Sequence, residues 1–268
     1  NIKKVEKYFK KKIAGKGNYE DSNLAANLKF KKKTSEFPKN VIFLHIFRDS
    51  PFGIIDNSRI FKDYFEWIEF TLKIICKSEE KWLFKIHPSV KRWGEDSQSI
   101  LRNMINKYGS NKNIIIDKDT YSNFDIFKHS KRIVTFNGTS HLESIASGLK
   151  PIVISDCTMT NLDKKLVHKP INIKEYENLL LKKKSFRIKS KKNKIFAKRV
   201  IYLIENFKSF GKDLRVSQTY ANDTQKKFNE EFLTISKNLV INRKFFNYLG
   251  KKLANGDTYT YAKNFYLL

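Results

Sequence analysis

The sequence predicts an α/β fold built around a doubly wound parallel sheet, of the Rossmann-like kind. Three observations lead to this prediction. Short apolar runs, rich in β-branched and aromatic residues, recur through the middle of the 268-residue chain. Segments with apolar residues at helical spacing lie between these runs. Strands that alternate with helices form parallel βαβ units with right-handed crossovers, which wind the sheet in this way.

The expected strands are short and apolar on both faces, which is typical of a buried parallel sheet. The first of them begins at Val41, where a Lys-rich segment that contains Pro38 gives way to an apolar run. The five strands are expected at residues 41–47, 82–86, 113–116, 132–136 and 151–155.

The helices are expected from apolar residues that repeat every three or four positions. Ser58 stands where the N-cap of the first one is expected. Gly109 and Gly148 stand where two later helices end. The helices of the alternating region are expected at residues 58–77, 95–108, 123–129 and 140–147. A further helix is expected at residues 174–182, and a basic, flexible-looking stretch follows it at 182–194. Two more helices are expected after that stretch, at residues 195–207 and 226–249.

Three parts of the chain differ in composition. Residues 1–39 are expected to form a basic linker or the end of a preceding domain, and residues 40–180 the Rossmann-like domain. Residues 181–268 are expected to form a basic helical C-terminal extension. The formal net charge of +27 is concentrated in the flanks, because residues 41–175 carry only +5 of it. The first residue is Asn rather than Met, so we expect the chain to be part of a longer protein.

Composition excludes several classes of protein. A hydrophobic fraction of 40% and an aromatic fraction of 14% are too high for a disordered chain. No apolar stretch is long enough to span a membrane, and the amino end lacks a signal-peptide pattern. Two cysteines, Cys76 and Cys157, are too few for a disulfide framework, which predicts a reducing, cytoplasmic compartment. Cys157 is expected to be a small buried residue rather than a nucleophile.

The basic flanks leave three interpretations open. They can bind nucleic acid, they can rest on anionic lipid at the inner membrane, or they can reflect a Lys-, Asn- and Ile-rich composition without a partner. The aromatic residues lie at the spacing of an amphipathic core rather than on a basic face. We therefore expect no nucleic-acid partner, and we keep peripheral contact with an anionic membrane as an open alternative.

Ligands of an open parallel sheet bind at the carboxyl ends of its strands, and the loop after the second strand carries His87. A His at this edge can donate a hydrogen bond to a phosphate oxygen or act in proton transfer. Pro88 would fix the loop behind it, and Lys85 is expected on the opposite face of the strand from Ile86. The alternative is an ordinary surface His at a turn.

The loop after the fourth strand consists of Asn137, Gly138, Thr139 and Ser140. A strand, a small polar turn and a helix together present backbone N–H groups and a macrodipole that favour phosphate. Thr139 and Ser140 add hydroxyl donors, and Glu143 can accept hydrogen bonds from a ribose or sugar. The alternative, compatible with binding, is that Thr139 or Ser140 is the N-cap and Glu143 its capping-box partner.

The loop after the first strand runs from His45 to Ser50 and contains Arg48 and Asp49. Asp49 can act as a base or a sugar ligand, and Arg48 can bind a phosphate. The alternative is a turn formed by the Asp-Ser-Pro sequence. The chain has no Cys/His cluster, so we expect neither a metal site nor a cofactor.

Three motifs stand in this order: Phe-x-x-Tyr-Phe-x-Trp at 61–67, Trp82-x-x-Lys85-x-His87-Pro88, and Asn137-Gly138-Thr139-x-x-x-Glu143-x-x-x-x-Gly148-x-x-Pro151. Their combination resembles the capsule polysaccharide biosynthesis proteins, which are bacterial glycosyltransferases of the Kdo-transferase type. The resemblance covers about half of the chain, and it is to the nucleotide-sugar domain, the second half of a GT-B fold. A complete GT-B protein has an acceptor-binding domain before this one, so the activity of this chain alone stays open.

The resemblance implies a nucleotide-sugar donor whose phosphate meets His87 and the turn from Gly138 to Ser140, with Glu143 near the ribose or base. From the residues and the resemblance together, we expect His87 and Asp49 to be catalytic, although the base of the family usually lies in the preceding domain. The expected donor-binding residues are Arg48, Lys85, Pro88, Asn137, Gly138, Thr139, Ser140 and Glu143. The transfer would be independent of metal, because hydrogen-bond donors and the helix dipole would stabilise the leaving phosphate.

The resemblance further implies a glycosyltransferase of bacterial capsule or surface polysaccharide synthesis, with CMP-Kdo as one candidate donor. The acceptor would be a lipid-linked or other glycan. The alternatives are a polyol-phosphate transferase or another nucleotide-sugar enzyme on the same fold, a non-catalytic partner subunit, and a non-catalytic basic binding module.

Overall fold

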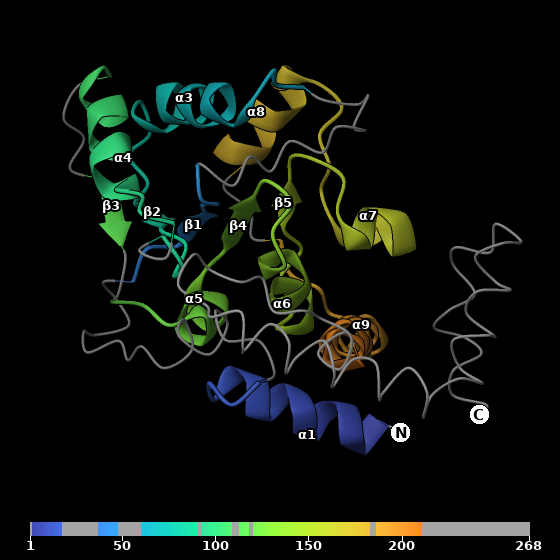
Figure 1. The fold of residues 1–268 in the computed structure, drawn as a ribbon. Coiled ribbons are helices and arrows are strands. Elements are labelled where there is room, and N and C mark those ends of the chain that lie inside the picture. Colours follow the sequence, from blue (N-terminus) through green and yellow to red (C-terminus); the bar gives the residue numbers. More distant parts are fainter. Residues whose placement is uncertain are drawn as a thin grey trace, which may run out of the picture. The chain divides into compact units, whose positions relative to one another are not determined.

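The computed structural model describes residues 2–17, 37–47, 60–90, 93–108, 113–117, 120–182 and 186–210, with side chains to residue 205. The chain forms two compact units, residues 1–201 and residues 202–268. The described part of the first unit contains a five-stranded sheet and the helices around it (Figure 1). In the second unit the structure describes only the end of one helix.

All five strands are parallel and lie in the order β3-β2-β1-β4-β5. They are β1 (Asn40–Phe43), β2 (Trp82–Lys85), β3 (Ile114–Asp117), β4 (Arg132–Thr135) and β5 (Ile152–Val153). In β1, Val41 stands beside Leu83 of β2 and Ile133 of β4. The chain therefore winds from β1 out to β3, returns to β4 and continues to β5. This is the doubly wound, Rossmann-like arrangement, and the predicted fold class is confirmed.

Helices cover both faces of this sheet (Figure 1). One layer contains α3 (Tyr64–Ile75), α4 (Ser97–Asn106) and α8 (Ile173–Leu181). The other layer contains α5 (Asn123–His129) and α6 (Ser140–Ala146), with α1 (Ile2–Ile13) and the start of α9 (Lys191–Phe210) outside them. The short helix α7 (Thr158–Asp163) and a 3₁₀ turn (Lys164–Leu166) follow β5.

Alternate residues of the strands fill two separate cores, as the period of two in a strand requires. Ile42 and Phe84 face α3, α4 and α8, whereas Val41 and Leu83 face α5. In the first core, the Tyr176 hydroxyl of α8 accepts a hydrogen bond from Trp67 Nε1 of α3 at 2.8 Å. This buried bond fixes α8 on α3, so α8 belongs to the sheet domain.

Most of the expected elements are present within a few residues of their predicted limits, but two limits were wrong. Helix α3 begins at Tyr64 rather than at 58, because Asp63 is its N-cap and accepts the Glu66 N–H at 2.8 Å. Residues 60–63 form bends instead. The stretch at 182–194 was expected to be irregular, yet α9 begins at Lys191 within it.

The structure tests some of the remaining predictions and leaves others outside its described residues. Residues 1–39 contain α1, an amphipathic helix whose apolar face is buried within the first unit. Gly148 ends α6 with a φ of +94°, as predicted from its type. Ser58, Gly109 and the helix expected at 226–249 lie outside the described residues. The three-part domain division stays a prediction.

In the described part of the chain, no helix has the length and apolar character needed to cross a membrane.

Candidate functional site

The switch point of the sheet lies between β1 and β4, where the chain turns from one half of the sheet to the other. The carboxyl ends of β1, β2 and β4 therefore lie side by side at one edge. Ligands of doubly wound sheets bind at this place. The sequence brings three polar loops to it: one from His45 after β1, one from Ile86 after β2, and one from Phe136 after β4.

Gly138, in the loop after β4, permits a close approach of the loop after β1. A Cβ atom at position 138 would lie 3.0 Å from Nε2 of His45 and 3.3 Å from Oγ1 of Thr135. Only a residue without a side chain leaves room for both groups. The turn predicted as a phosphate site thus packs directly against His45.

The His45 ring is held in place from the helix layer that contains α3. Its backbone N–H donates to the hydroxyl of Tyr64 at 2.7 Å, and its ring meets the Tyr64 ring edge-on with centroids 6.2 Å apart. Burial raises the pKa of Tyr64, so the phenol stays protonated. Burial, together with the nearby His87, lowers the pKa of His45 to about 4. His45 is therefore a neutral imidazole at neutral pH.

His87 lies in the turn after β2, as predicted, and is half-buried beside Pro88. Its Nδ1 accepts the backbone N–H of Ser89 at 3.2 Å. An Nδ1 that accepts a hydrogen bond carries no proton, so the neutral ring bears its proton on Nε2. His87 therefore offers a hydrogen-bond donor, which suits a phosphate oxygen.

Three buried polar atoms around the Gly138 turn have no hydrogen-bond partner among the described residues: His45 Nε2, Thr135 Oγ1 and His141 Nε2. The other ring nitrogen of His141, Nδ1, lies 2.6 Å from the Gly138 carbonyl oxygen and must donate to it. Burial lowers the pKa of His141 to about 4, so its Nε2 is an unprotonated acceptor at neutral pH. Buried polar atoms are nearly always paired, so these three mark a place with unused hydrogen-bonding capacity.

The capping interpretation was right that Thr139 is the N-cap but wrong that Glu143 forms a capping box with it. Thr139 is the N-cap of α6, but its side chain makes no capping hydrogen bond and it is exposed. Ser140 is the first helical residue, and Glu143 bonds elsewhere. The hydroxyl of Thr139 therefore remains available at the edge of the sheet, beside the half-buried Asn137. Since α6 has only seven residues, side chains and loop N–H groups matter more here than its dipole.

Two predicted donor-binding residues lie away from this turn and have other partners. Lys85, on the face opposite Ile86 as predicted, is buried and places Nζ 2.7 Å from Oδ2 of Asp117 in β3. Asp117 also accepts the backbone N–H of Thr120 at 2.8 Å. A buried pair that is satisfied in this way links two strands. The role of Lys85 in donor binding stays a prediction.

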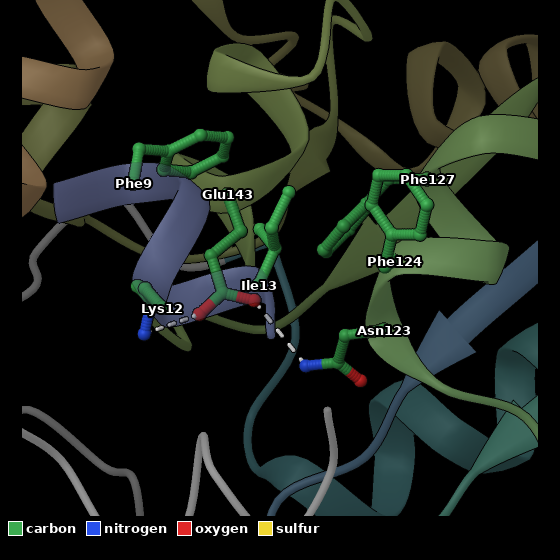
Figure 2. Close-up of a pocket in the computed structure, with 7 residues that line it drawn as sticks. All are labelled: Phe9, Lys12, Ile13, Asn123, Phe124, Phe127 and Glu143. Atoms are coloured by element: carbon green, nitrogen blue, oxygen red, sulfur yellow. Dashed lines mark hydrogen bonds and ion pairs between the residues drawn. The ribbon is translucent and has the colours of Figure 1, made fainter. Parts of the chain in front are cut away.

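Glu143 lines a small pocket between α1, α5 and α6 (Figure 2). Its carboxylate is 3.0 Å from Nζ of Lys12 in α1, and it accepts the side-chain amide of Asn123 in α5 at 3.2 Å. Phe9, Ile13, Phe124 and Phe127 form the apolar wall of the pocket. Helix α1 thus covers the residue that the resemblance places near a ribose, and contact of Glu143 with a donor stays a prediction.

Arg48 and Asp49 lie outside the described residues, so the structure does not place them. Of the remaining predicted residues, the structure brings His87 and the Gly138 turn to the same edge. It adds His45, Thr135 and His141, which sequence reasoning missed. His45 comes two residues after β1 ends at Phe43. That position at the carboxyl end of β1 was the signal that could have identified it.

The described residues contain no group of three or more His, Cys, Asp or Glu side chains placed to bind a metal ion. Burial raises the pKa of the Cys157 thiol, and its side chain is buried before α7. Cys157 thus has the character of a structural residue, as predicted.

No family model matches the chain, and no curated protein matches it. A solved structure that is similar is UDP-GlcNAc 2-epimerase from Methanocaldococcus jannaschii, with a TM-score of 0.39 and 20% sequence identity. The match covers 68% of this chain and 52% of the epimerase chain, so the chain spans about half the length of that structure. A likeness this distant indicates neither the substrate nor the reaction of this chain.

Proposed function

We propose that this chain binds the phosphate of a nucleotide-sugar donor at the carboxyl edge of β1, β2 and β4 and acts in glycosyl transfer. The observation that carries the proposal is the convergence of His45, His87 and the Gly138 turn at the switch point of the sheet. Doubly wound sheets bind nucleotides at this point. The ordered motifs of residues 61–151 favour glycosyl transfer over other uses of such a site.

In glycosyl transfer, the bond between the anomeric carbon of the sugar and a phosphate oxygen breaks, and the phosphate keeps the electron pair. The leaving phosphate therefore gains negative charge. His87 Nε2–H and the Thr139 hydroxyl can donate hydrogen bonds to that charge, together with N–H groups of the turn. Donors that are already in place stabilise such a leaving group at little reorganisation cost.

The finer parts of the proposal come from the loop after β1 and from the family resemblance. From the loop sequence, Asp49 would be the base that activates the acceptor hydroxyl, and Arg48 would bind a donor phosphate. The donor would be a cytidine nucleotide sugar such as CMP-Kdo, and the acceptor a lipid-linked or other glycan of a bacterial surface polysaccharide. A polyol-phosphate transferase or another nucleotide-sugar enzyme is the alternative that the same site allows.

The test is calorimetric titration of the chain with CMP, CDP, UDP and GDP, beside the His87→Ala variant. We expect one cytidine nucleotide to bind and His87→Ala to weaken its binding by about tenfold to 100-fold, because a hydrogen bond to a charged group is lost. The matched control is His129→Ala. His129 is also half-buried, but it ends α5 just before β4 begins, at the opposite edge of the sheet.

Each outcome separates the proposal from an alternative. Binding of CDP or UDP alone would keep the site and change the donor. Equal losses in the two His variants would remove His87 from the site. A chain that binds none of the four nucleotides would contradict the proposal and favour a non-catalytic binding module.

A further inference from the structure

Helix α1 has two faces of opposite character. Its residues Val5, Phe9 and Lys12 are buried within the first unit. Its exposed positions are Ile2, Lys3, Lys4, Lys7, Lys10 and Lys11. These lysines repeat at spacings of three and four residues, so they form one continuous stripe along the helix.

The start of α9 lies beside α1 and adds to the same surface (Figure 1). Lys198 of α9 places Nζ 3.9 Å from Oε1 of Glu6 and 5.2 Å from the centre of the Phe9 ring. Lys191 is seven residues before Lys198 and lies on the same side of α9, by the period of a helix. The exposed residues of α9 up to residue 201 are Lys191, Lys192 and Arg199. We name six of the exposed cations of the two helices the basic ridge: Lys7, Lys10, Lys11, Lys191, Lys192 and Arg199.

The described helical segments that carry the basic ridge contain few acidic residues. In α1 and in residues 191–201, the only acid is Glu6, and Lys198 lies against it. Lys12, the one buried lysine of α1, is neutralised by Glu143 and does not belong to the ridge. The ridge is therefore a one-signed surface, which attracts an anionic partner over a distance of about one Debye length.

We propose that the basic ridge binds the surface of an anionic lipid bilayer. All but one of its cations are lysines, which act as point charges toward phosphate headgroups and lack the planar fork of Arg that nucleic-acid recognition favours. In α1 and in α9 up to residue 201, none of the exposed residues is aromatic, so this part of the surface offers no platform on which bases could stack. The proposal does not rest on the proposed donor site, because the ridge lies on other helices than the loops of His87 and Gly138.

The experiment compares two triple variants of the full chain that remove the same charge. The ridge variant is Lys7→Gln, Lys10→Gln and Lys11→Gln. The control variant is Lys73→Gln, Lys77→Gln and Lys81→Gln, all exposed positions in or after α3, in the helix layer on the other face of the sheet. Gln is a good helix former, so far-UV circular dichroism and thermal melts should match the wild type.

Binding is measured by co-sedimentation with vesicles of phosphatidylcholine alone or with about one third phosphatidylglycerol. We expect the wild type to bind only the anionic vesicles, less so as salt increases. The ridge variant should bind them about 100-fold more weakly, at about fivefold for each lysine, and the control variant should bind like the wild type. A variant with Arg at the same three positions should restore binding.

Three results would overturn the proposal. Equal losses in the ridge and control variants would mean that net charge rather than this surface governs binding. Failure of the wild type to bind anionic vesicles would exclude a lipid partner. Stronger binding of the wild type to a polyribonucleotide than to the vesicles, lost in the ridge variant, would assign the ridge to nucleic acid.

Discussion

A methyl group added at Gly138 would lie 3.0 Å from Nε2 of His45 and 3.3 Å from Oγ1 of Thr135. The His45 ring is backed by Tyr64 and has little room to retreat. We expect Gly138→Ala to lower the free energy of unfolding by about 1 kcal/mol through overpacking. We also expect it to weaken binding of the nucleotide by about tenfold, because it moves a residue of the proposed site. Denaturant unfolding and calorimetric titration would measure the two effects.

Gly148→Ala is the matched control for this prediction. Its φ of +94° makes any side chain there unfavourable, so stability should fall for a backbone reason. Position 148 lies at the far end of α6 from the Gly138 turn, and nucleotide affinity should not change. Equal affinity losses in both variants would mean that the effect of Gly138→Ala comes from general destabilisation.

For single residues, the sequence predicts which side chains stand at strand ends but not which residues they contact in space. His87 and the Gly138 turn were predicted for the carboxyl edge, because the end of a strand can be located from its apolar run. The contact of His45 with Gly138 joins loops about ninety residues apart in the chain. Neither loop alone indicates that contact, since it depends on which strands are neighbours.

The link between α1 and α6 depends on a buried ion pair between Lys12 and Glu143, 3.0 Å apart. Removal of one partner leaves a buried charge without compensation, which costs about 3 to 5 kcal/mol. We therefore expect Lys12→Met to lower the free energy of unfolding by about 3 kcal/mol and Glu143→Gln in the same background to restore part of it. Denaturant unfolding of the single and double variants would measure this coupling.

The exposed pair of Lys174 and Glu177 in α8 is the matched control, with the Lys174 side chain 76% exposed. Lys174→Met should change stability by less than about 1 kcal/mol. If Lys12→Met has an equally small effect, α1 is not held on the domain by this pair.

The helices and strands of the sheet domain were predictable because their apolar spacing is local information. The start of α3 was misplaced because Ser58 and Asp63 are both good N-cap types, and only the backbone shows which one accepts the N–H bond. Helix α1 lies in the segment predicted as a basic linker or the end of a preceding domain, because its many lysines hide the buried stripe of Val5 and Phe9. That stripe has meaning only when α5 and α6 are present to receive it.

Three histidines make the stability of the whole molecule depend on pH. Burial lowers the pKa of His45, His141 and His168 from 6.5 to about 4. Between these values the unfolded chain binds more protons than the folded chain, so the free energy of unfolding rises with pH. Their contribution is complete above about pH 6.5 and is lost as the pH falls toward 4.

His141 offers the cleanest test, because its side chain is fully buried. Asn at this position can still donate to the Gly138 carbonyl but does not titrate. The wild type should lose stability as the pH falls from about 7 to about 4.5, and His141→Asn should reduce this loss by about 2 to 3 kcal/mol. This amount follows from the lowering of the His141 pKa from 6.5 to about 4, at about 1.4 kcal/mol per pKa unit. Urea unfolding at several pH values would measure the slope, and an unchanged slope would contradict the prediction.

The sequence by itself determined the α/β class, the five strands of the described sheet and the edge at which the candidate loops meet. It could do so because burial of an apolar face imposes a periodicity that is visible in neighbouring residues. Only the tertiary structure decided the strand order, the partners of Lys85 and Glu143, and the approach of His45 to Gly138. These depend on which distant segments pack together, and a charged or polar residue has the same local signature whether it meets a ligand or an ion-pair partner.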